Sequence, residues 1–271
     1  MPVKYWLFPD GKSPVKTKLW NWSSNFVCGL AGAVFKVYLE KLNYCKVYNK
    51  EKIIDTVDQV RKSGRSLITY SNHDSCIDDP TTLAMLRWDH VLNGKRLRWV
   101  LVADEICFTS KPLALFFSLG KAIPVIRGEG IYQKPMDYAL DKIDRGGWVH
   151  IFPEGKINLE KTYIRFKWGI GRLLTEAQQC PIVVPFYHYG MDEALPTKTP
   201  YFPRFKKKIT ILVGNPIDFS EELERLKHKM TATELRKHFT DILQEKLYAL
   251  RKEAEELHKV RKAEEPHKAD R

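Results

Sequence analysis

Short apolar runs alternate with longer segments of mixed polarity along most of the chain. Apolar runs bounded by glycine, proline or polar residues are typical of buried strands, and longer segments with a helical period predict helices. The expected strands cover residues 66–70, 97–102, 122–126, 148–152, 182–186 and 208–213. The expected helices cover residues 26–35, 50–62, 79–88, 112–119, 131–143 and 168–179, and two more close the chain.

Strands that alternate with helices predict an α/β fold with a mixed, largely parallel central sheet flanked by helices. Asp79 is the expected N-cap of the helix that begins near residue 80, and Thr231 and Glu234 form a capping-box pattern before the last helix. We expect an N-terminal membrane-interacting segment over residues 1–45 and a central domain over 46–219. The C-terminal helices, residues 220–271, should pack on that domain and have a charged end.

The most apolar segment is residues 26–35, FVCGLAGAVF. As a helix it covers ~15 Å, about half of the ~30 Å hydrocarbon core of a bilayer, so it is too short to span. It could instead enter one leaflet of a membrane, or it could be an ordinary core helix. Trp20 and Trp22 precede it, at positions suited to interfacial anchors, and they favour membrane contact without a full span.

Composition limits the class of protein further. The chain has 271 residues, 44% of them apolar, which is enough for one large core. Its formal net charge of +12 suits anionic partners, either phospholipid headgroups or nucleic acid, but no nucleic-acid motif is present. The five cysteines include no CxxC pair, and neither a metal-site pattern nor a phosphate-binding loop appears. We therefore expect no metal, no cofactor and no nucleic-acid partner.

His73 and Asp78 follow the strand predicted at residues 66–70. Five residues separate them, and on a regular helix this spacing would put them on different faces, so a contact requires the turn before the helix. Such a turn could bring the carboxylate to one imidazole nitrogen and leave the other free to accept a proton from a hydroxyl. The alternative is that His73 only satisfies hydrogen bonds within the turn.

Three further polar sites also follow predicted strands. Arg127 could hold a phosphate through its guanidinium, or it could be a solvated loop residue. Glu154, in the Phe-Pro-Glu-Gly turn that ends at Gly155, could hydrogen-bond a glycerol hydroxyl or orient Arg127; the alternative is a surface ion pair. His188 follows Val184-Pro185 and is either a second candidate base or a buried wall residue. In parallel α/β sheets such loops gather on one edge and build the site.

These segments together resemble the glycerophospholipid acyltransferase family. The family pattern has an Asn-His-x4-Asp block, a glycine-to-arginine strand block, a Phe-Pro-Glu-Gly block and a Val-Pro block. The corresponding blocks are Asn72-His73 to Asp78, Gly120 to Arg127, Phe152 to Gly155 and Val184-Pro185, in the same order. The resemblance implies that residues 46–219 form an acyltransferase domain in which His73 and Asp78 are the catalytic pair. It also implies that Arg127, Glu154 and Gly155 bind the glycerophosphate part of the substrate.

A more detailed resemblance, over residues 67–205, is to the mitochondrial transacylases of that family. The stretches that carry it include SNHDSCIDDP, ADEICFTS, FFSLGKAIPVIRGEGIYQK and WVHIFPEGKIN. Many family members continue the Phe-Pro-Glu-Gly block with Thr-Arg-Ser, whereas this chain has Lys156-Ile157-Asn158. This resemblance implies acyl transfer between phospholipids and lysophospholipids without coenzyme A, remodelling cardiolipin with phosphatidylcholine. It also implies monotopic attachment to the outer and inner mitochondrial membranes, facing the intermembrane space.

Two other functions account for part of the sequence. An acyl-coenzyme A-dependent lysophospholipid acyltransferase would use the same residues, and only the transacylase-like stretches disfavour it. A non-enzymatic basic module that binds anionic lipid would explain the net charge of +12. It would not explain why His73, Asp78, Arg127 and Glu154 all follow predicted strands.

Overall fold

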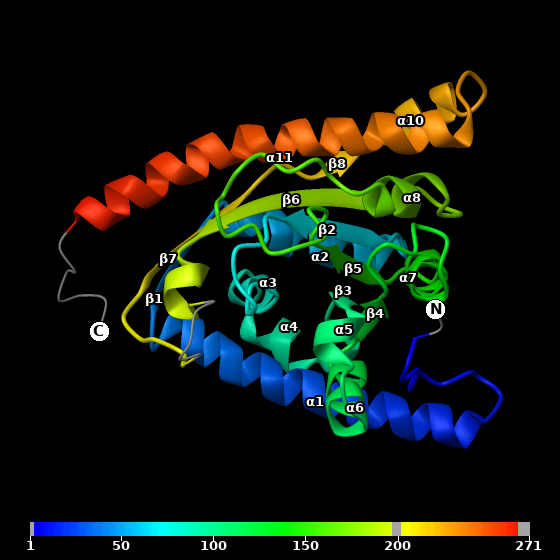
Figure 1. Ribbon diagram of the computed structural model, residues 1–271, viewed down its shortest axis with the longest axis horizontal. Coiled ribbons are helices and arrows are strands. Elements are labelled where there is room, and N and C mark those ends of the chain that lie inside the picture. The colour runs from blue at the N-terminus through cyan, green and yellow to red at the C-terminus, as the bar shows by residue number, and fades with distance from the viewer. Residues whose placement is uncertain (1–2, 197–201, 265–271) are drawn as a thin grey trace.

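The computed structural model describes residues 3–196 and 202–264, and its centre is one twisted sheet (Figure 1). The strand order is β1-β7-β6-β2-β5-β3-β4, and β8 pairs with β6. The strands are β1 Tyr44–Tyr48, β2 Leu67–Ser71, β3 Trp99–Ala103, β4 Ala122–Val125, β5 Trp148–Ile151, β6 Ile182–Tyr189, β7 Lys208–Val213 and β8 Ile217–Asp218.

The predicted fold class is confirmed: the sheet is mixed, largely parallel and flanked by helices. Strands β6, β2, β5, β3 and β4 run parallel to one another, and β1 is parallel to β7. Only the pairs β6–β7 and β6–β8 are antiparallel in the described part of the chain. The carboxyl ends of five adjacent strands therefore meet at one edge, where the segments after β2, β4 and β5 lie.

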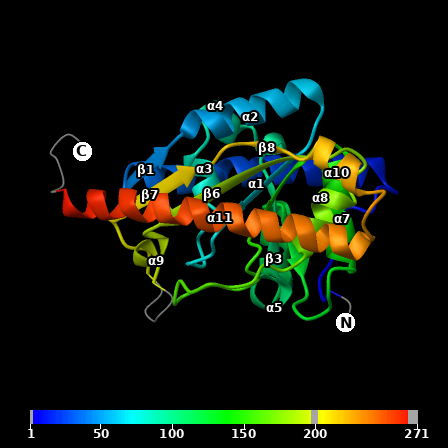
Figure 2. The ribbon, with the colours of Figure 1, turned by 90° about the horizontal axis from the view of Figure 1, so that it is seen from above.

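Helices cover both faces of the sheet, as the two orthogonal views show (Figures 1 and 2). One face packs against α1 Pro14–Glu40, α2 Lys50–Ser63, α3 Thr81–Ala84 and α4 Trp88–Leu92. The other packs against α7 Lys134–Asp144, α8 Gly169–Thr175, α10 Ser220–Leu226 and α11 Ala232–Ala263. The remaining helices are η1 Gly94–Arg96, α5 Asp104–Cys107, α6 Lys111–Leu119 and α9 Met191–Ala194. The predicted capping box at the start of α11 is confirmed: Thr231 and Glu234 bond reciprocally.

The N-terminal helix is much longer than the apolar segment predicted it to be. Ser13 caps it, Pro14 occupies its first turn, and it continues for 27 residues, about 40 Å at 1.5 Å per residue. The polar residues on either side of the apolar run are helical because they follow the same two-faced pattern. Even so, no helix within the described residues is both long and apolar enough to cross a membrane.

The structure also corrects local predictions. Strands β1 and β8 were not predicted, and β1 runs across the predicted boundary between residues 45 and 46. The helix predicted over 79–88 is interrupted into α3 and α4, and Asp79 is not its N-cap. The Asp79 carboxylate instead accepts a hydrogen bond from Arg98 Nε at 2.9 Å, which fixes the turn to the segment before β3. Strand β6 continues to Tyr189, so His188 lies inside the strand rather than after it.

Candidate active site

The turn after β2 brings His73 and Asp78 together. The two side chains meet at 2.9 Å, between His73 Nδ1 and Asp78 Oδ2. Asp78 is fully buried, whereas the His73 side chain keeps 19% of its surface exposed. Strand β2 ends at Ser71 and α3 begins at Thr81, so irregular backbone between them supplies the geometry that a helix would forbid. The imidazole therefore has one edge on a buried carboxylate and the other toward the surface.

Hydrogen bonds around Asp78 fix both the carboxylate and the ring. Asp78 Oδ2 also accepts the backbone N–H of Asp74 at 2.6 Å and of Ser75 at 2.7 Å. These contacts hold the carboxylate in place, and the carboxylate in turn favours the tautomer with the proton on His73 Nδ1. His73 stacks on Phe152, with ring centroids 4.2 Å apart. Nε2, which has no hydrogen bond to any described residue, is left as the proton acceptor.

Asn72 anchors this turn to the neighbouring strand β6. Its Nδ2 donates to the His188 carbonyl and to Asp74 Oδ2, both at 2.9 Å, and its Oδ1 accepts the His188 backbone N–H at 2.9 Å. Asn72 is fully buried and thus replaces main-chain ladder bonds where β2 ends. Sequence reasoning quoted Asn72 only as part of a motif; its position just before His73 was the available signal for a positioning role.

His188 is a wall residue of the site. It is fully buried inside β6, and its Nε2 lies 3.1 Å from the Asn72 carbonyl and 3.8 Å from Asp78 Oδ2. The latter separation is longer than an ordinary hydrogen bond. Because the His188 side chain is fully buried, the ring has no surface from which to reach a substrate hydroxyl, and this burial favours the wall interpretation over the second-base interpretation.

Glu154 lies in the turn after β5 and is 3% exposed. Its Oε2 is buried and has no hydrogen-bond partner among the described residues. Burial, and then the negative charge of Asp74, raise the pKa of Glu154 to about 8, while a hydrogen bond from Asn158 acts in the opposite direction. Gly155 adopts φ 72°, and a side chain there would approach Lys167 to 3.0 Å, so the turn needs glycine. The surface ion-pair interpretation of Glu154 is therefore wrong.

Arg127 lies beyond the end of β4 and pairs with Glu105 of α5. Arg127 Nη1 and Glu105 Oε1 are 3.1 Å apart, and the two side chains are 44% and 50% exposed. The idea that Glu154 orients Arg127 is not what the structure shows, because the partner of the guanidinium is Glu105. Sequence reasoning missed Glu105 altogether, since nothing in the local pattern around it marks a partner for a residue 22 positions away.

Asn158 joins the turn after β5 to the backbone of His73. Its N–H donates to the His73 carbonyl at 2.6 Å. Its side chain closes the following turn through Thr162, donating to the Thr162 carbonyl at 2.8 Å and accepting its N–H at 3.2 Å. The position that departs from the wider family's Thr-Arg-Ser pattern thus holds two parts of the candidate site together.

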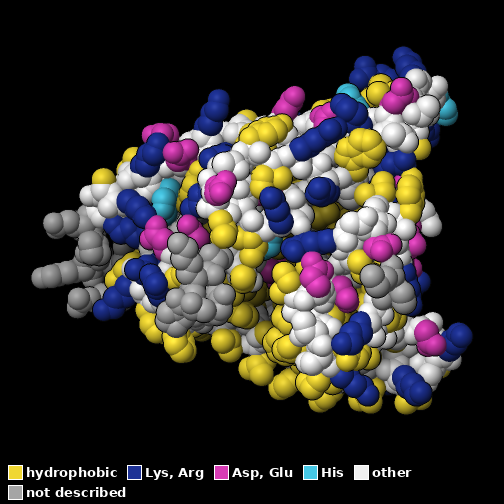
Figure 3. All heavy atoms as spheres, viewed as in Figure 1, with side chains coloured by type: hydrophobic (Ala, Val, Ile, Leu, Met, Phe, Trp, Pro, Cys, Tyr) yellow, Lys and Arg dark blue, Asp and Glu magenta, His cyan; other side chains and the backbone are white. Residues whose placement is uncertain are grey.

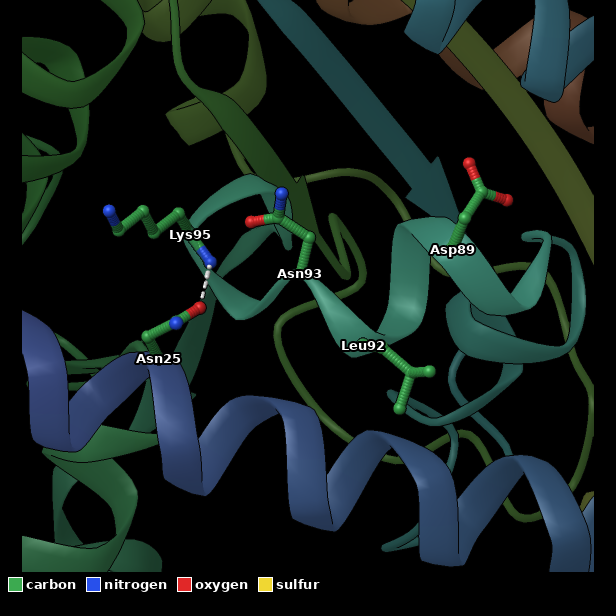
Figure 4. Close-up of a pocket in the computed structure, with 5 residues that line it drawn as sticks. All are labelled: Asn25, Asp89, Leu92, Asn93 and Lys95. Carbon is green, nitrogen blue, oxygen red and sulfur yellow. Dashed lines mark hydrogen bonds between the residues drawn. The ribbon is translucent and has the colours of Figure 1, made fainter.

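A hollow of about 390 Å³ lies elsewhere, between α1, α4 and η1 (Figure 4). Asn25, Asp89, Leu92, Asn93 and Lys95 line it, and Asn25 Oδ1 accepts the Lys95 backbone N–H at 2.7 Å. In Figure 4 the Lys95 and Asp89 side chains point away from each other, so they do not converge on a common ligand. It shares no lining residue with the turn that carries His73.

The site offers no arrangement for a metal ion within the described residues: no group of three or more histidine, cysteine, aspartate or glutamate side chains is suitably placed. What the arrangement can do chemically is take a proton from a hydroxyl at His73 Nε2 and stabilise the imidazolium that forms through Asp78.

Comparison with known proteins agrees with this chemistry. Residues 45–188 match the acyltransferase family. A tafazzin from Drosophila melanogaster is 41% identical over 257 residues, covering 94% of this chain and 67% of that protein. An N-acylphosphatidylethanolamine synthase from Arabidopsis thaliana is 37% identical, covering 72% of this chain and 70% of that protein.

A solved structure supports the fold. The 1-acyl-sn-glycerophosphate acyltransferase of Thermotoga maritima superposes with a TM-score of 0.56 at 16% identity, covering 89% of this chain and 84% of that one. The fold, the family match and the similarity along almost the whole chain agree: this protein is an acyltransferase, and it belongs to the acyltransferase family among relatives that include the tafazzins.

Proposed function

We propose that the protein is a transacylase that moves acyl chains between phospholipids and lysophospholipids without coenzyme A, and that it remodels cardiolipin. The observation that carries the acyl-transfer part is the His73–Asp78 pair, with Nε2 directed outward from a buried carboxylate. The 41% identity to a tafazzin over 94% of the chain supports transacylation over the use of a thioester.

In the proposed reaction, His73 Nε2 takes the proton from the free hydroxyl of a lysophospholipid. The oxygen attacks the ester carbonyl of a donor phospholipid, and the tetrahedral intermediate collapses with release of the donor's glycerol oxygen. His73 returns its proton to that oxygen, so one base serves both halves of the reaction. Asp78 holds the ring and stabilises the imidazolium in between. Arg127, Glu154 and Gly155 are the proposed binding residues for the glycerophosphate part.

The donor test is acyl exchange in defined liposomes. We expect label to pass from phosphatidylcholine to lysocardiolipin when coenzyme A is omitted, and also in the reverse direction, because substrate and product esters are nearly equal in energy. The measurement is the rate of label transfer by the purified protein, with the His73→Ala protein as a control. Transfer that occurs only when acyl-coenzyme A is supplied would refute the transacylase proposal and leave the thioester-dependent enzyme.

The same experiment distinguishes hydroxyl acceptors from amine acceptors. The similarity to an N-acylphosphatidylethanolamine synthase indicates an amine as the alternative acceptor. Liposomes that contain phosphatidylethanolamine would then yield an alkali-stable N-acyl product, whereas our proposal predicts alkali-labile esters. An alkali-stable product as the main one would overturn the proposal of hydroxyl acceptors.

We further propose that the protein binds the membrane surface through α1. The exposed apolar side chains of α1 follow one another at intervals of three or four residues and so form one face, the α1 face: Val15, Leu19, Trp22, Phe26, Leu30, Val34 and Val37. Phe116 of α6 is also exposed, and apolar side chains gather along this lower edge of the molecule (Figure 3). The opposite face of α1, with Cys28 and Lys36, is buried.

An exposed apolar face of this kind is more typical of a protein attached to one side of a membrane than of a protein surrounded by water. Soluble monomers seldom expose so long an apolar stripe, and tryptophan at its edge is typical of the interfacial region of a bilayer. The net charge of +12 would add attraction to anionic lipid. The proposed location is the mitochondrial outer and inner membranes facing the intermembrane space, by similarity to the tafazzins.

Vesicle binding tests the α1 face. Wild-type protein should keep a bound fraction at high salt, because salt screens the charges but not apolar insertion. Phe26→Glu together with Leu30→Glu should weaken that fraction at least about tenfold, since burying each apolar side chain contributes ~1.5–3 kcal/mol. Val260→Glu is the matched control, because Val260 is exposed and belongs to α11, the helix that lies across the sheet from α1 (Figure 1). Binding that high salt abolishes completely would contradict insertion of α1.

A further inference from the structure

The end of α9 is hydrogen-bonded both to α1 and to the turn after β2. On one side, the Ala194 carbonyl lies 3.1 Å from the Tyr38 hydroxyl of α1, and that hydroxyl also lies 2.8 Å from the Arg204 carbonyl. On the other side, the Ser75 hydroxyl donates to the Leu195 carbonyl at 3.1 Å. Because Ala194 and Leu195 are adjacent in sequence, one short piece of backbone joins the last turn of α1 to the turn after β2.

Ser75 connects this piece of backbone to the carboxylate of the candidate site. The Ser75 N–H donates to Asp78 Oδ2 at 2.7 Å, and the same oxygen lies 2.9 Å from His73 Nδ1. Ser75 is fully buried, so water does not compete for either of its bonds. Its hydroxyl fixes it to the end of α9, and its N–H holds the carboxylate. A path of hydrogen bonds and adjacent residues therefore runs from Tyr38 to the carboxylate that orients the imidazole.

Other buried polar contacts hold α1 against the rest of the protein. Lys36 Nζ donates to the Leu86 carbonyl at 2.7 Å, and the Ser24 hydroxyl donates to the Leu119 carbonyl at 2.7 Å. Lys36 and Ser24 are each 1% exposed. These two contacts lie on either side of the apolar middle of the helix, so the packing of α1 does not depend on the hydroxyl of Tyr38.

The ring and the hydroxyl of Tyr38 have separate roles. The ring packs edge-on against Phe205, with ring centroids 6.1 Å apart, and phenylalanine would keep this contact. The Ala194 carbonyl already accepts the Arg204 N–H at 2.7 Å, so it does not need the hydroxyl as its partner. What the hydroxyl adds is a link from α1 to the end of α9, and from there to Ser75.

We propose that Tyr38 and Ser75 are positioning residues for the His73–Asp78 pair, so that α1 helps to build the site as well as carrying the α1 face. Tyr38 fixes the end of α9, the end of α9 fixes Ser75, and the Ser75 N–H holds Asp78 Oδ2. This inference rests on the proposed function, in which His73 is the base. Because both residues are buried and do not touch substrate, their loss should misalign the base and lower kcat while KM stays the same.

The first test is the kcat of acyl transfer in liposomes. Tyr38→Phe should lower kcat by about two- to tenfold, the range expected for the loss of one hydrogen bond, and should leave the KM for the lysophospholipid unchanged. Ser75→Ala should lower kcat at least as much, because it interrupts the path at the turn itself. Ser24→Ala is the matched control: it removes another buried hydroxyl of α1 that donates to a main-chain carbonyl, but at Leu119 of α6, and kcat should equal that of the wild type. Vesicle binding should be the same for all of these proteins, because none of the three hydroxyls belongs to the α1 face.

A double-mutant cycle tests the path between the two residues. If Tyr38 acts through Ser75, Tyr38→Phe should lower kcat much less in the Ser75→Ala protein than in the wild type, because the path is already interrupted. Equal factors in both proteins would show that the two residues act independently. A normal kcat for Tyr38→Phe would show that its hydroxyl only satisfies carbonyls. Each of these two results overturns the proposal.

Amide hydrogen exchange decides the positioning role without any turnover. The N–H groups of Asp74 and Ser75, which both donate to Asp78 Oδ2, should exchange faster in Tyr38→Phe than in the wild type and should keep their protection in Ser24→Ala. Exchange at these two amides that Tyr38→Phe leaves unchanged would overturn the proposal. Absence of acyl transfer by the wild-type protein counts against the proposed function, whereas the exchange comparison still decides whether Tyr38 positions this turn.

Discussion

Replacing His73 with alanine is expected to slow acyl transfer by roughly 10²- to 10⁴-fold, the usual contribution of a positioned general base. The imidazole is the group with a nitrogen directed outward and its other nitrogen held by a buried carboxylate at 2.9 Å. Because 19% of the side chain is exposed and the ring is at the edge of the core, its removal should leave the protein folded. The measurement is the initial rate of label transfer in liposomes, beside the circular dichroism spectrum and the unfolding midpoint.

Asp78→Asn should also remove most activity, for a different reason. An amide cannot stabilise the imidazolium, and it can bond the ring in the wrong tautomer. Its oxygen could still accept the backbone N–H groups of Asp74 and Ser75, which should limit the damage to the turn. His228→Ala, at an exposed histidine before α11, is the control for loss of a histidine as such. A well-folded His73→Ala protein with near-normal exchange rates would end the assignment of His73 as the base.

Much of the fold could be predicted because the strands buried on both faces are short, mostly apolar runs, as in LITYS of β2 and WVHI of β5. Strand β1, YCKVY, escaped prediction because it lies at the edge of the sheet and is only partly buried, so its composition is mixed. Helix α1 was predicted too short because an apolar count finds its most hydrophobic turns and not the polar ends that complete the amphipathic pattern.

The contacts of the candidate site also divide into those that the sequence predicts and those that it does not. Residues that follow one strand in one motif, such as His73 and Asp78, could be predicted because sequence neighbours share a turn. The Arg98 contact of Asp79 and the Glu105 contact of Arg127 join segments that are distant in sequence. Such pairings depend on how the loops of β2, β3 and β4 meet in space, which local patterning does not encode.

Glu154→Gln is expected to stabilise the protein increasingly as pH rises from about 5 to about 8. In the folded protein, burial and the charge of Asp74 raise the pKa of Glu154 from 4.5 to about 8. Asp78 also acts in this direction, whereas Arg251 and the Asn158 hydrogen bond oppose it. Below pH 4.5 the carboxyl is neutral in both the folded and the unfolded protein, so its contribution to the free energy of unfolding is fully present. Above that pH only the unfolded state ionises readily, so stability is lost until the folded group also ionises near pH 8.

Glutamine has nearly the same shape and does not titrate, so the variant should escape this loss. The free energy of unfolding of Glu154→Gln should exceed that of the wild type by more at pH 8 than at pH 5. This increase should be several kcal/mol and at most about 5 kcal/mol, since each pKa unit corresponds to about 1.36 kcal/mol. Urea unfolding of both proteins at the two pH values measures it, provided that the m-values agree. Glu253→Gln, at an exposed glutamate of α11, is the matched control and should show no comparable rise. A difference between Glu154→Gln and wild type that stays constant from pH 5 to pH 8 would show that Glu154 ionises normally. The carboxylate would then need a cationic partner inside the site, whereas a rising difference means that the Glu154 carboxyl stays a neutral acid in the folded protein well above pH 4.5.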